Sequence, residues 1–199
     1  YLEPWHLDYE DFLNLRRNTG DDRLRCHDMN TASWIPDEFM RRVQNEDVWY
    51  FFDPKDTACE DGRNLHDLFG KEFDNKYNEL CNQAEEGLIE NYRVTPAKEL
   101  WKKMLKVLFE TSHPWSTFKD PCNIRYTNQH EGVVHSSNLC TEITLHTKSS
   151  KYESGEKKEI DKNAVCNLGS INLLNHLKED DTFDYNKLES TIHTAIRIL

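Results

Sequence analysis

The segment Ser136-Ser137-Asn138-Leu139-Cys140-Thr141-Glu142-Ile143 is the most informative stretch of the 199-residue sequence. If it forms a β-strand, its side chains alternate between two faces, so Asn138, Cys140 and Glu142 project from the same face. At a rise of about 3.3 Å per residue, neighbours in this row stand about 6.6 Å apart, so one sugar-sized molecule could touch all three. An amide can orient hydroxyl groups, a thiol can exchange hydrogen or attack, and a carboxylate can accept a proton. The pattern therefore predicts a strand that carries a candidate reactive site.

Strand-like runs with few helix formers lie around this segment in the second half of the chain. They are Cys122–Tyr126, Val133–Ser137, Leu139–Leu145 and Ala164–Leu173. The stretch Thr147–Asn163 is dense in Ser, Lys, Glu and Gly, which predicts a solvated surface loop between the last two runs.

Helical patterns dominate the first half of the chain. Thr95 and Pro96 open the clearest one, because the apolar residues after them follow the 3.6-residue period. These apolar residues are Leu100, Trp101, Met104, Leu105, Leu108 and Phe109. Further helices are expected over residues 8–17, 37–44, 65–84 and 188–199, and residues 48–52 are expected to form a short buried strand. This succession predicts an α/β fold with a partly parallel sheet, helix-rich in its first half and strand-bearing in its second.

The composition is that of an ordinary globular chain, with 37% hydrophobic residues, 31% charged residues and a formal net charge of −11. No apolar stretch approaches the length of a membrane span, and no basic stripe suits a nucleic acid polymer, so neither partner is expected. Six widely spaced cysteines without a Cys-x-x-Cys pair indicate a reducing, cytoplasmic compartment. Because the chain starts without Met and stops inside a helical pattern, we expect an internal piece of a longer polypeptide.

Two other interpretations of the Cys140 segment stay open on the pattern alone. In a non-catalytic α/β binding module, Asn138, Cys140 and Glu142 would face solvent and the thiol would be inert. In a cysteine hydrolase, Cys140 would be the nucleophile and His135, or else His130, the base.

The spacing of histidines and cysteines matches no closed zinc-site pattern, so no metal site is predicted. The residues considered are His113, Cys122, His130, His135 and Cys140. A phosphate-binding glycine loop is excluded as well, because neither G-x-x-x-x-G-K-[ST] nor G-x-G-x-x-G occurs.

A second thiol lies in the run Ala164–Leu173, where Cys166 stands among apolar residues and Gly169 permits a close backbone approach. By itself Cys166 is typical of a core cysteine. Beside the first segment it becomes a candidate second thiol for the same cavity.

Four motifs together resemble the large catalytic, or α, subunit of ribonucleotide reductase. They are Tyr1–His6 (YLEPWH), Lys119–Asn123 (KDPCN), Ser137–Glu142 (SNLCTE) and Ala164–Ser170 (AVCNLGS). The resemblance implies a thiyl-radical enzyme on a ten-stranded α/β barrel that reduces ribonucleoside diphosphates to 2′-deoxyribonucleotides for DNA synthesis. Residues 1–199 would be part of a single catalytic barrel domain, with the ATP cone and the C-terminal portion outside them, and would be inactive alone.

The same resemblance implies roles for the residues around Cys140. Cys140 would become the transient radical and remove the 3′ hydrogen of the ribose, and Glu142 would accept the proton of the 3′-hydroxyl group. Asn138 would hydrogen-bond the substrate, and Leu139 and Thr141 would lend backbone contacts.

Cys166 would be one of the two thiols that reduce the 2′ position and end as a disulfide, its partner lying upstream of Tyr1. The sulfurs of Cys140 and Cys166 are expected to face one cavity. No cofactor or metal would bind this chain directly. The radical would come from a separate di-metal small subunit, or alternatively from adenosylcobalamin, and ATP and deoxynucleotide effectors would bind elsewhere. Thioredoxin or glutaredoxin, and a second copy of the full-length chain in a homodimer, are the other partners implied.

Overall fold

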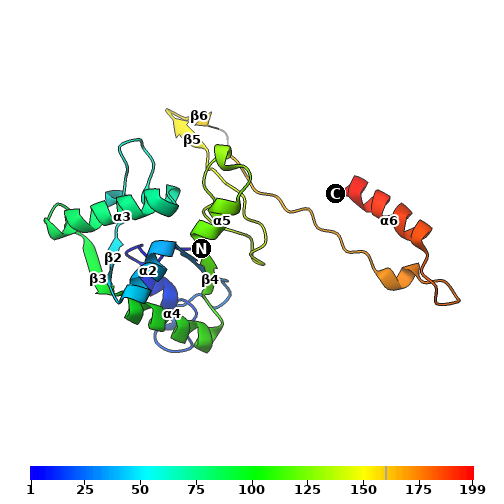
Figure 1. Ribbon diagram of the computed structural model, residues 1–199, viewed down its shortest axis with the longest axis horizontal. Helices are drawn as coiled ribbons and strands as arrows, with labels where there is room; N and C mark the ends of the chain where they lie inside the picture. The colour runs from blue at the N-terminus through cyan, green and yellow to red at the C-terminus, as the bar shows by residue number, and fades with distance from the viewer. Residues whose placement is uncertain (160) are drawn as a thin grey trace. The chain divides into compact units, whose positions relative to one another are not determined.

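The computed structural model describes residues 1–159 and 161–199, which divide into an N-terminal unit, Tyr1–Asn163, and a C-terminal unit, Ala164–Leu199 (Figure 1). The helices of the N-terminal unit are α1 (Tyr9–Asn14), α2 (Asp37–Asn45), α3 (Gly70–Glu85), α4 (Ala97–Thr111) and α5 (Lys119–Arg125). Its strands are β1 (Ala32–Ile35), β2 (Val48–Phe52), β3 (Tyr92–Pro96), β4 (Trp115–Phe118), β5 (Lys151–Glu153) and β6 (Glu156–Glu159). Short 3₁₀ turns are η1 (Asp22–Leu24), η2 (Pro54–Asp56), η3 (Leu65–Asp67) and η4 (Gln129–Glu131). None of the helices in the described residues has the length and apolar character that crossing a membrane requires.

The opening segment of the chain joins two pairs of strands. β1 runs parallel to β4, and β2 runs antiparallel to β3. Residues 2–7 lie between the pairs: Leu2 N donates to Ala32 O at 3.1 Å on the β1 side, and Leu7 N donates to Phe52 O at 2.9 Å on the β2 side. The bridges on both sides are parallel. A partly parallel arrangement of strands is therefore present, as the sequence predicts. The segment at its centre, residues 2–7, has no regular strand structure, and the sequence pattern did not predict a strand there.

β2 forms the centre of the core, because its residues 49–52 are all buried. The ring of Trp49 stacks on Tyr77 of α3 with centroids 4.3 Å apart, and meets Phe39 of α2 edge-on at 4.9 Å. The Tyr77 hydroxyl also accepts from Tyr50 N at 2.7 Å and donates to Tyr50 O at 2.9 Å. The uninterrupted apolar run in the sequence thus corresponds to a strand with helices packed against it.

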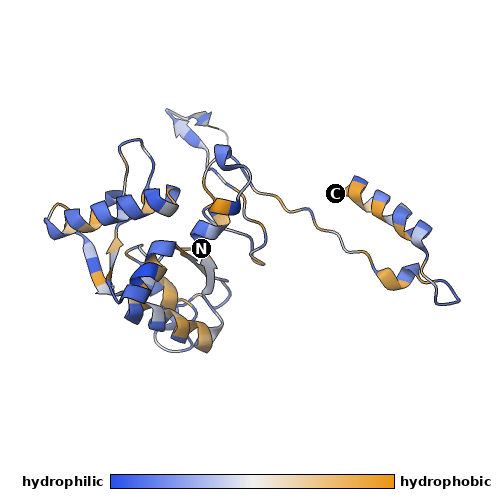
Figure 2. Ribbon diagram, viewed as in Figure 1, coloured by the Kyte–Doolittle hydropathy of each residue, from blue (hydrophilic) through white to orange (hydrophobic). Residues whose placement is uncertain are grey.

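α4 confirms the strongest helical prediction, with a shifted buried face. Leu100, Met104 and Val107 are buried, whereas Phe109, which the periodicity assigned to the core, is 93% exposed. Figure 2 shows hydrophobic and hydrophilic residues alternating along this helix. Thr95 and Pro96, which the sequence predicts to open this helix, instead end β3, where they pair with β2.

The helix expected over residues 65–84 is two elements, η3 and α3, separated at Gly70. Gly70 begins α3 instead of weakening its interior. Its φ of +59° lies in the left-handed region, which a residue with a Cβ adopts only at a cost.

The four strand predictions for the second half are wrong. Cys122–Tyr126 falls largely in α5, and residues 133–137, 139–145 and 164–172 form no strand. The predicted surface loop 147–163 instead holds the hairpin β5–β6. Strand-type residues favour a sheet only when another strand pairs with them, and here side chains take over backbone bonding: Val134 N donates to Asn123 Oδ1 at 2.7 Å.

The C-terminal unit consists of extended chain, the turn η5 (Leu173–His176) and helix α6 (Tyr185–Ile198). The Asp184 side chain caps α6 by accepting from Lys187 N at 3.0 Å, and His176 Nε2 lies 3.0 Å from Thr191 Oγ1. This helix confirms the prediction for the end of the chain. The fold class is α/β as predicted, and the described strands form no closed barrel.

Candidate active site

Cys140 lies at a turn in the chain. Thr141 N donates to Asn138 O at 3.1 Å, which closes a turn around Leu139 and Cys140, and Thr141 has a φ of +70°. A strand cannot contain such a turn. The predicted row of Asn138, Cys140 and Glu142 on one strand face is therefore wrong, and these side chains are presented by a loop.

Asn138 and Ser137 fix the base of this loop. Asn138 Oδ1 accepts from Ile143 N at 3.0 Å, and Ser137 Oγ donates to Ile143 O at 2.6 Å. The backbone carbonyl of Asn138 accepts from the Tyr1 hydroxyl at 3.0 Å. The loop is thus held from within and by the first residue of the chain. Asn138, which the resemblance expects to hydrogen-bond the substrate, already uses its amide oxygen within the loop.

The loop faces a pocket beside β4 with a volume of about 240 Å³. The residues that line this pocket are Trp115, Ser116, Thr117, Leu139, Cys140 and Thr141. Cys140 and Glu142 are exposed, and Asn138 is partly buried. Glu142 is near Tyr1: burial, together with the Cys122 thiol and the Glu142 carboxylate, raises the pKa of the Tyr1 hydroxyl. Cys140 is thus accessible from a hollow that could hold part of a ligand.

Cys166 belongs to the C-terminal unit, where it is partly buried. Its neighbour Asn167 donates through Nδ2 to Leu199 O at 2.8 Å, and a Cβ added to Gly169 would lie 3.5 Å from the Leu199 side chain. The chain near Cys166 is therefore tied to the end of α6. That both sulfurs face one cavity stays a prediction.

A buried ion pair, which the sequence reasoning missed, lies at the start of α5. Lys119 is fully buried and donates from Nζ to Glu3 Oε1 at 2.8 Å and to His66 O at 2.9 Å. Its ammonium group lies 5.1 Å from the ring centroid of Phe73, and the Trp5 indole donates to Glu3 Oε2 at 2.6 Å. Burial raises the pKa of Glu3, and Lys119 opposes that rise. The sequence signal that could have revealed this pair is the presence of charged residues of opposite sign in the motifs YLEPWH and KDPCN, Glu3 in the first and Lys119 in the second.

Asp120 caps two helices at once. Its carboxylate accepts from Asp37 N at 2.6 Å, at the start of α2, and from Gly70 N, at the start of α3. Neither helix has a capping side chain of its own, because Pro36 and Phe69 occupy the N-cap positions. A carboxylate at two helix N-termini satisfies two backbone donors and complements both helix dipoles.

Asn123 connects α5 to the chain that leads into the Cys140 loop. Its side chain donates to Lys119 O at 3.0 Å and to Val134 O at 3.1 Å, and accepts from Val134 N. Lys119, Asp120 and Asn123 thus tie the opening segment, two helices and the chain before the loop to one short helix. The motif KDPCN has a positioning role in this structure.

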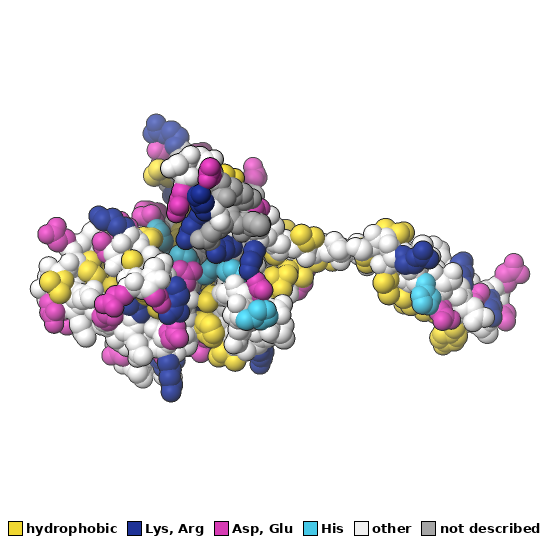
Figure 3. Space-filling view, turned by 90° about the horizontal axis from the view of Figure 1, so that it is seen from above, with side chains coloured by type: hydrophobic (Ala, Val, Ile, Leu, Met, Phe, Trp, Pro, Cys, Tyr) yellow, Lys and Arg dark blue, Asp and Glu magenta, His cyan; other side chains and the backbone are white. Residues whose placement is uncertain are grey.

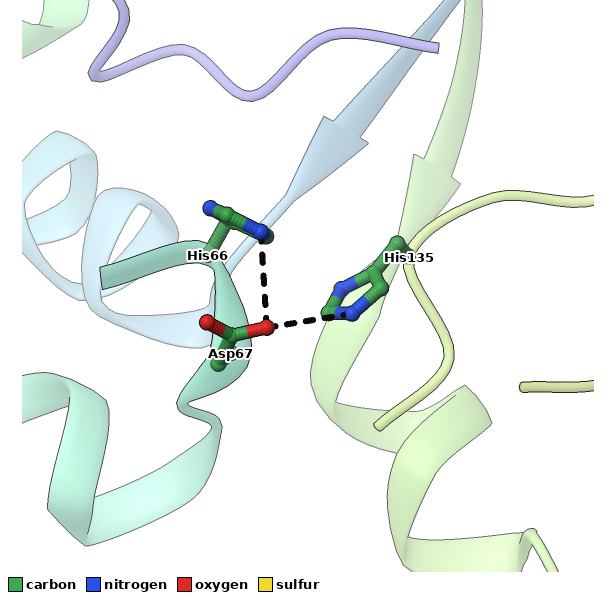
Figure 4. A group of neighbouring side chains, drawn as sticks. All are labelled: His66, Asp67 and His135. Atoms are coloured by element: carbon green, nitrogen blue, oxygen red, sulfur yellow. Dashed lines mark ion pairs between the residues drawn. The ribbon is translucent and has the colours of Figure 1, made fainter. Parts of the chain in front are cut away.

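His135 pairs with Asp67 rather than with Cys140. Figure 4 shows Asp67 between His66 and His135: Asp67 Oδ1 lies 3.4 Å from His66 Nε2 and 3.2 Å from His135 Nε2. Figure 3 shows histidine side chains gathered beside acidic ones on one face of the molecule. His135 lines a different pocket from Cys140. The hydrolase interpretation therefore lacks His135 as a base at the thiol, and the other candidate, His130, lies beside Glu131, with Nε2 3.5 Å from Glu131 Oε1.

Residues 1–199 match the family described as "Ribonucleotide reductase, barrel domain". The chain is 51% identical, over its whole length, to the ribonucleoside-diphosphate reductase subunit alpha of Chlamydia muridarum, of which it covers 17%. It is 37% identical, again over its whole length, to the ribonucleoside-diphosphate reductase large subunit of Danio rerio, of which it covers 22%. The subunit alpha of Helicobacter pylori strain J99 is 42% identical over 76% of the chain, which covers 18% of that protein. The chain therefore belongs to the ribonucleotide reductase family, and it spans about a fifth of the length of these relatives.

Proposed function

We propose that this chain carries the reactive loop of the catalytic subunit of a ribonucleoside-diphosphate reductase, with Cys140 as the residue that becomes a thiyl radical. The observation that carries the proposal is the loop itself. In a chain of this family, Cys140 stands at a turn whose base is fixed by Asn138 and Ser137, and its thiol borders a pocket. A reactive group held at a defined position by a rigid base is what catalysis by orientation requires.

The proposed reaction is a two-electron reduction at C2′ of the ribose. The Cys140 thiyl radical takes the hydrogen from C3′, so that a C–H bond breaks and an S–H bond forms, and Glu142 accepts the proton of the 3′-hydroxyl group. Cys166 and a second thiol outside this chain supply two electrons and two hydrogens. They become a disulfide, the 2′-hydroxyl group leaves as water, and C2′ gains a hydrogen. Cys140 then returns its hydrogen to C3′ and is again a radical, and Glu142 returns the proton to the 3′ oxygen.

Substrate would contact the loop from Asn138 to Glu142. Leu139 and Thr141 line the pocket beside Cys140 and would offer backbone groups. Because Asn138 Oδ1 already accepts from Ile143 N, the contribution of Asn138 to binding would come from its amide nitrogen, or from the shape that it gives the loop.

The remaining parts of the system are proposed on the names of the relatives. The substrate is a ribonucleoside diphosphate, as those names state for them. A separate di-metal small subunit would generate the radical, thioredoxin or glutaredoxin would reduce the disulfide, and the full-length chain would be a cytoplasmic homodimer. Residues 1–199 would form part of a single catalytic barrel domain.

Three substitutions in the full-length protein test the assignment, with the small subunit and a dithiol reductant present. Cys140→Ser should abolish turnover and leave nucleotide binding intact, because a serine O–H bond is too strong for the radical to be transferred. Glu142→Gln should slow the reaction by about 10²–10⁴-fold, the usual contribution of a general base. Cys166→Ser should still permit the first hydrogen abstraction, and the intermediate should then decompose and release free base.

Cys26→Ser is the matched control, because Cys26 is also an exposed free cysteine and lies outside the loop. It should behave like the unmodified protein. Steady ribonucleotide reduction by Cys140→Ser would overturn the proposal. That result would mean that Cys140 is an exposed inert thiol and that another residue carries the radical.

A further inference from the structure

Among the side chains that the structure describes, those of His66, Asp67 and His135 form the only group of three His, Cys, Asp or Glu residues close enough to hold a metal ion. Their ligand atoms all lie within 4.8 Å of one another. The first two come from η3 and the third from the chain that leads into the Cys140 loop, so the fold brings together ligands that are far apart in the sequence. Figure 4 shows both imidazole rings turned toward the same carboxylate oxygen.

The two separations between Asp67 and the histidines are longer than those of direct ion pairs and close to the edge of a tetrahedral zinc site. Charge-assisted hydrogen bonds between nitrogen and a carboxylate are about 2.7–2.9 Å long, whereas the two N–O separations here are 3.2 and 3.4 Å. With zinc bonds of about 2.0–2.1 Å, the edge of the coordination tetrahedron is about 3.3–3.4 Å. Both edges that run from Asp67 have nearly the length that a bound zinc ion requires, whereas the ligand atoms of His66 and His135, which lie within 4.8 Å of each other, would move closer together on binding.

The surroundings set His66 in the tautomer that a metal needs. Asn64 donates from Nδ2 to Pro54 O at 2.8 Å, which fixes the orientation of its amide, so Oδ1 is the atom 3.3 Å from His66 Nδ1. A carbonyl oxygen only accepts, so Nδ1 carries the hydrogen and the lone pair is on Nε2, the atom that faces Asp67.

Asp67 is held as a carboxylate and is still free to bind with one oxygen. Its Oδ2 accepts from Asn64 N at 2.8 Å, and Oδ1 is the atom between the two imidazoles.

Solvent can reach the group, because His66, Asp67 and His135 all line an open hollow of about 960 Å³. Two imidazoles and one carboxylate with an open position are the ligand set of a first-row divalent metal that keeps a water molecule.

We propose that His66, Asp67 and His135 bind one zinc ion, with water as the fourth ligand. The ion would join η3 to the chain at His135, shortly before Asn138, and so to the root of the Cys140 loop. This site is separate from the proposed reductase chemistry and does not rest on it.

The test is a zinc titration of the full-length protein after removal of metal by a chelator, with a chromophoric chelator as competitor. One equivalent should bind per chain at this site. His66→Gln and His135→Gln should each weaken it by at least ~100-fold, more than the 10–100-fold typical of losing an outer-shell partner. Co²⁺ in place of Zn²⁺ should give the visible absorption of a tetrahedral nitrogen and oxygen site, without thiolate charge-transfer bands.

His130→Gln is the matched control, because His130 also lies beside a carboxylate, with Nε2 3.5 Å from Glu131 Oε1, but outside the group. It should bind zinc as the unmodified protein does. A second measurement needs no variant: zinc should protect His66 and His135 from acylation by diethyl pyrocarbonate. Unchanged binding in both glutamine variants, thiolate bands in the cobalt spectrum, or no protection of the two histidines would each overturn the proposal.

Discussion

Lys119→Met tests the buried ion pair at the start of α5. The substitution keeps the length of the side chain and removes the ammonium group that Glu3 and His66 O contact at 2.8 and 2.9 Å. Removing one partner of a buried pair typically costs about 3–5 kcal/mol, because the other charge is left without compensation. At about 2–4 °C per kcal/mol for a domain of this size, the unfolding midpoint should fall by about 6–20 °C.

The double variant Glu3→Gln/Lys119→Met separates the charge from the packing. It leaves no charge where the ion pair was. The main remaining loss of stability, about 1–3 kcal/mol, comes from the His66 carbonyl, which no longer has a hydrogen-bond donor. The double variant should therefore be more stable than Lys119→Met alone. Urea unfolding followed by tryptophan fluorescence measures both, since Trp5 contacts Glu3 directly.

The loss of stability caused by Lys119→Met should depend on pH through the ionisation of Glu3. Burial already raises the pKa of Glu3 above its ordinary 4.5, and losing Lys119 removes the first of the groups that oppose the rise. A carboxyl group whose pKa is higher in the folded state binds more protons there, so acidification stabilises the fold relative to the unfolded chain. Lys119→Met should therefore reduce the free energy of unfolding most at pH values above the pKa of Glu3 in the folded state. The reduction should become smaller as the pH falls below that pKa toward 4.5. Equal stability of the single and double variants, or a cost independent of pH, would refute the reasoning.

Two further substitutions test the other side chains of α5. Asp120→Ala should lower the free energy of unfolding by about 2–4 kcal/mol, because the N–H groups of Asp37 and Gly70 both lose their acceptor. Hydrogen exchange at those two amides should accelerate, and unchanged exchange would contradict the shared cap. Asn123→Ala should lower the free energy of unfolding by about 2–3 kcal/mol, because three side-chain hydrogen bonds are lost, and should speed hydrogen exchange at the Val134 amide. Ile124→Ala, at an exposed position of the same helix, is the control and should change neither the stability nor the exchange rate.

The sequence by itself determined the elements whose signal is local. Residues 48–52 are apolar without interruption, and a strand covered by helices is where such a run is stable. The helix that begins at Ala97 follows from its period and from Pro96, although periodicity alone did not show that Phe109 faces outward. The four motifs also determined the family, because their residue identities do not depend on knowing the fold.

Only the tertiary structure decided how the site is built. The turn at Cys140 depends on Asn138 bonding its own loop and on Tyr1, 137 positions away, holding the Asn138 carbonyl. The capping of two helices by Asp120 joins residues 83 and 50 positions apart. Propensity and period describe neighbours along the chain, whereas these bonds form between groups that only folding brings together. A buried polar group must find a partner wherever the fold supplies one, and the sequence does not state where that is.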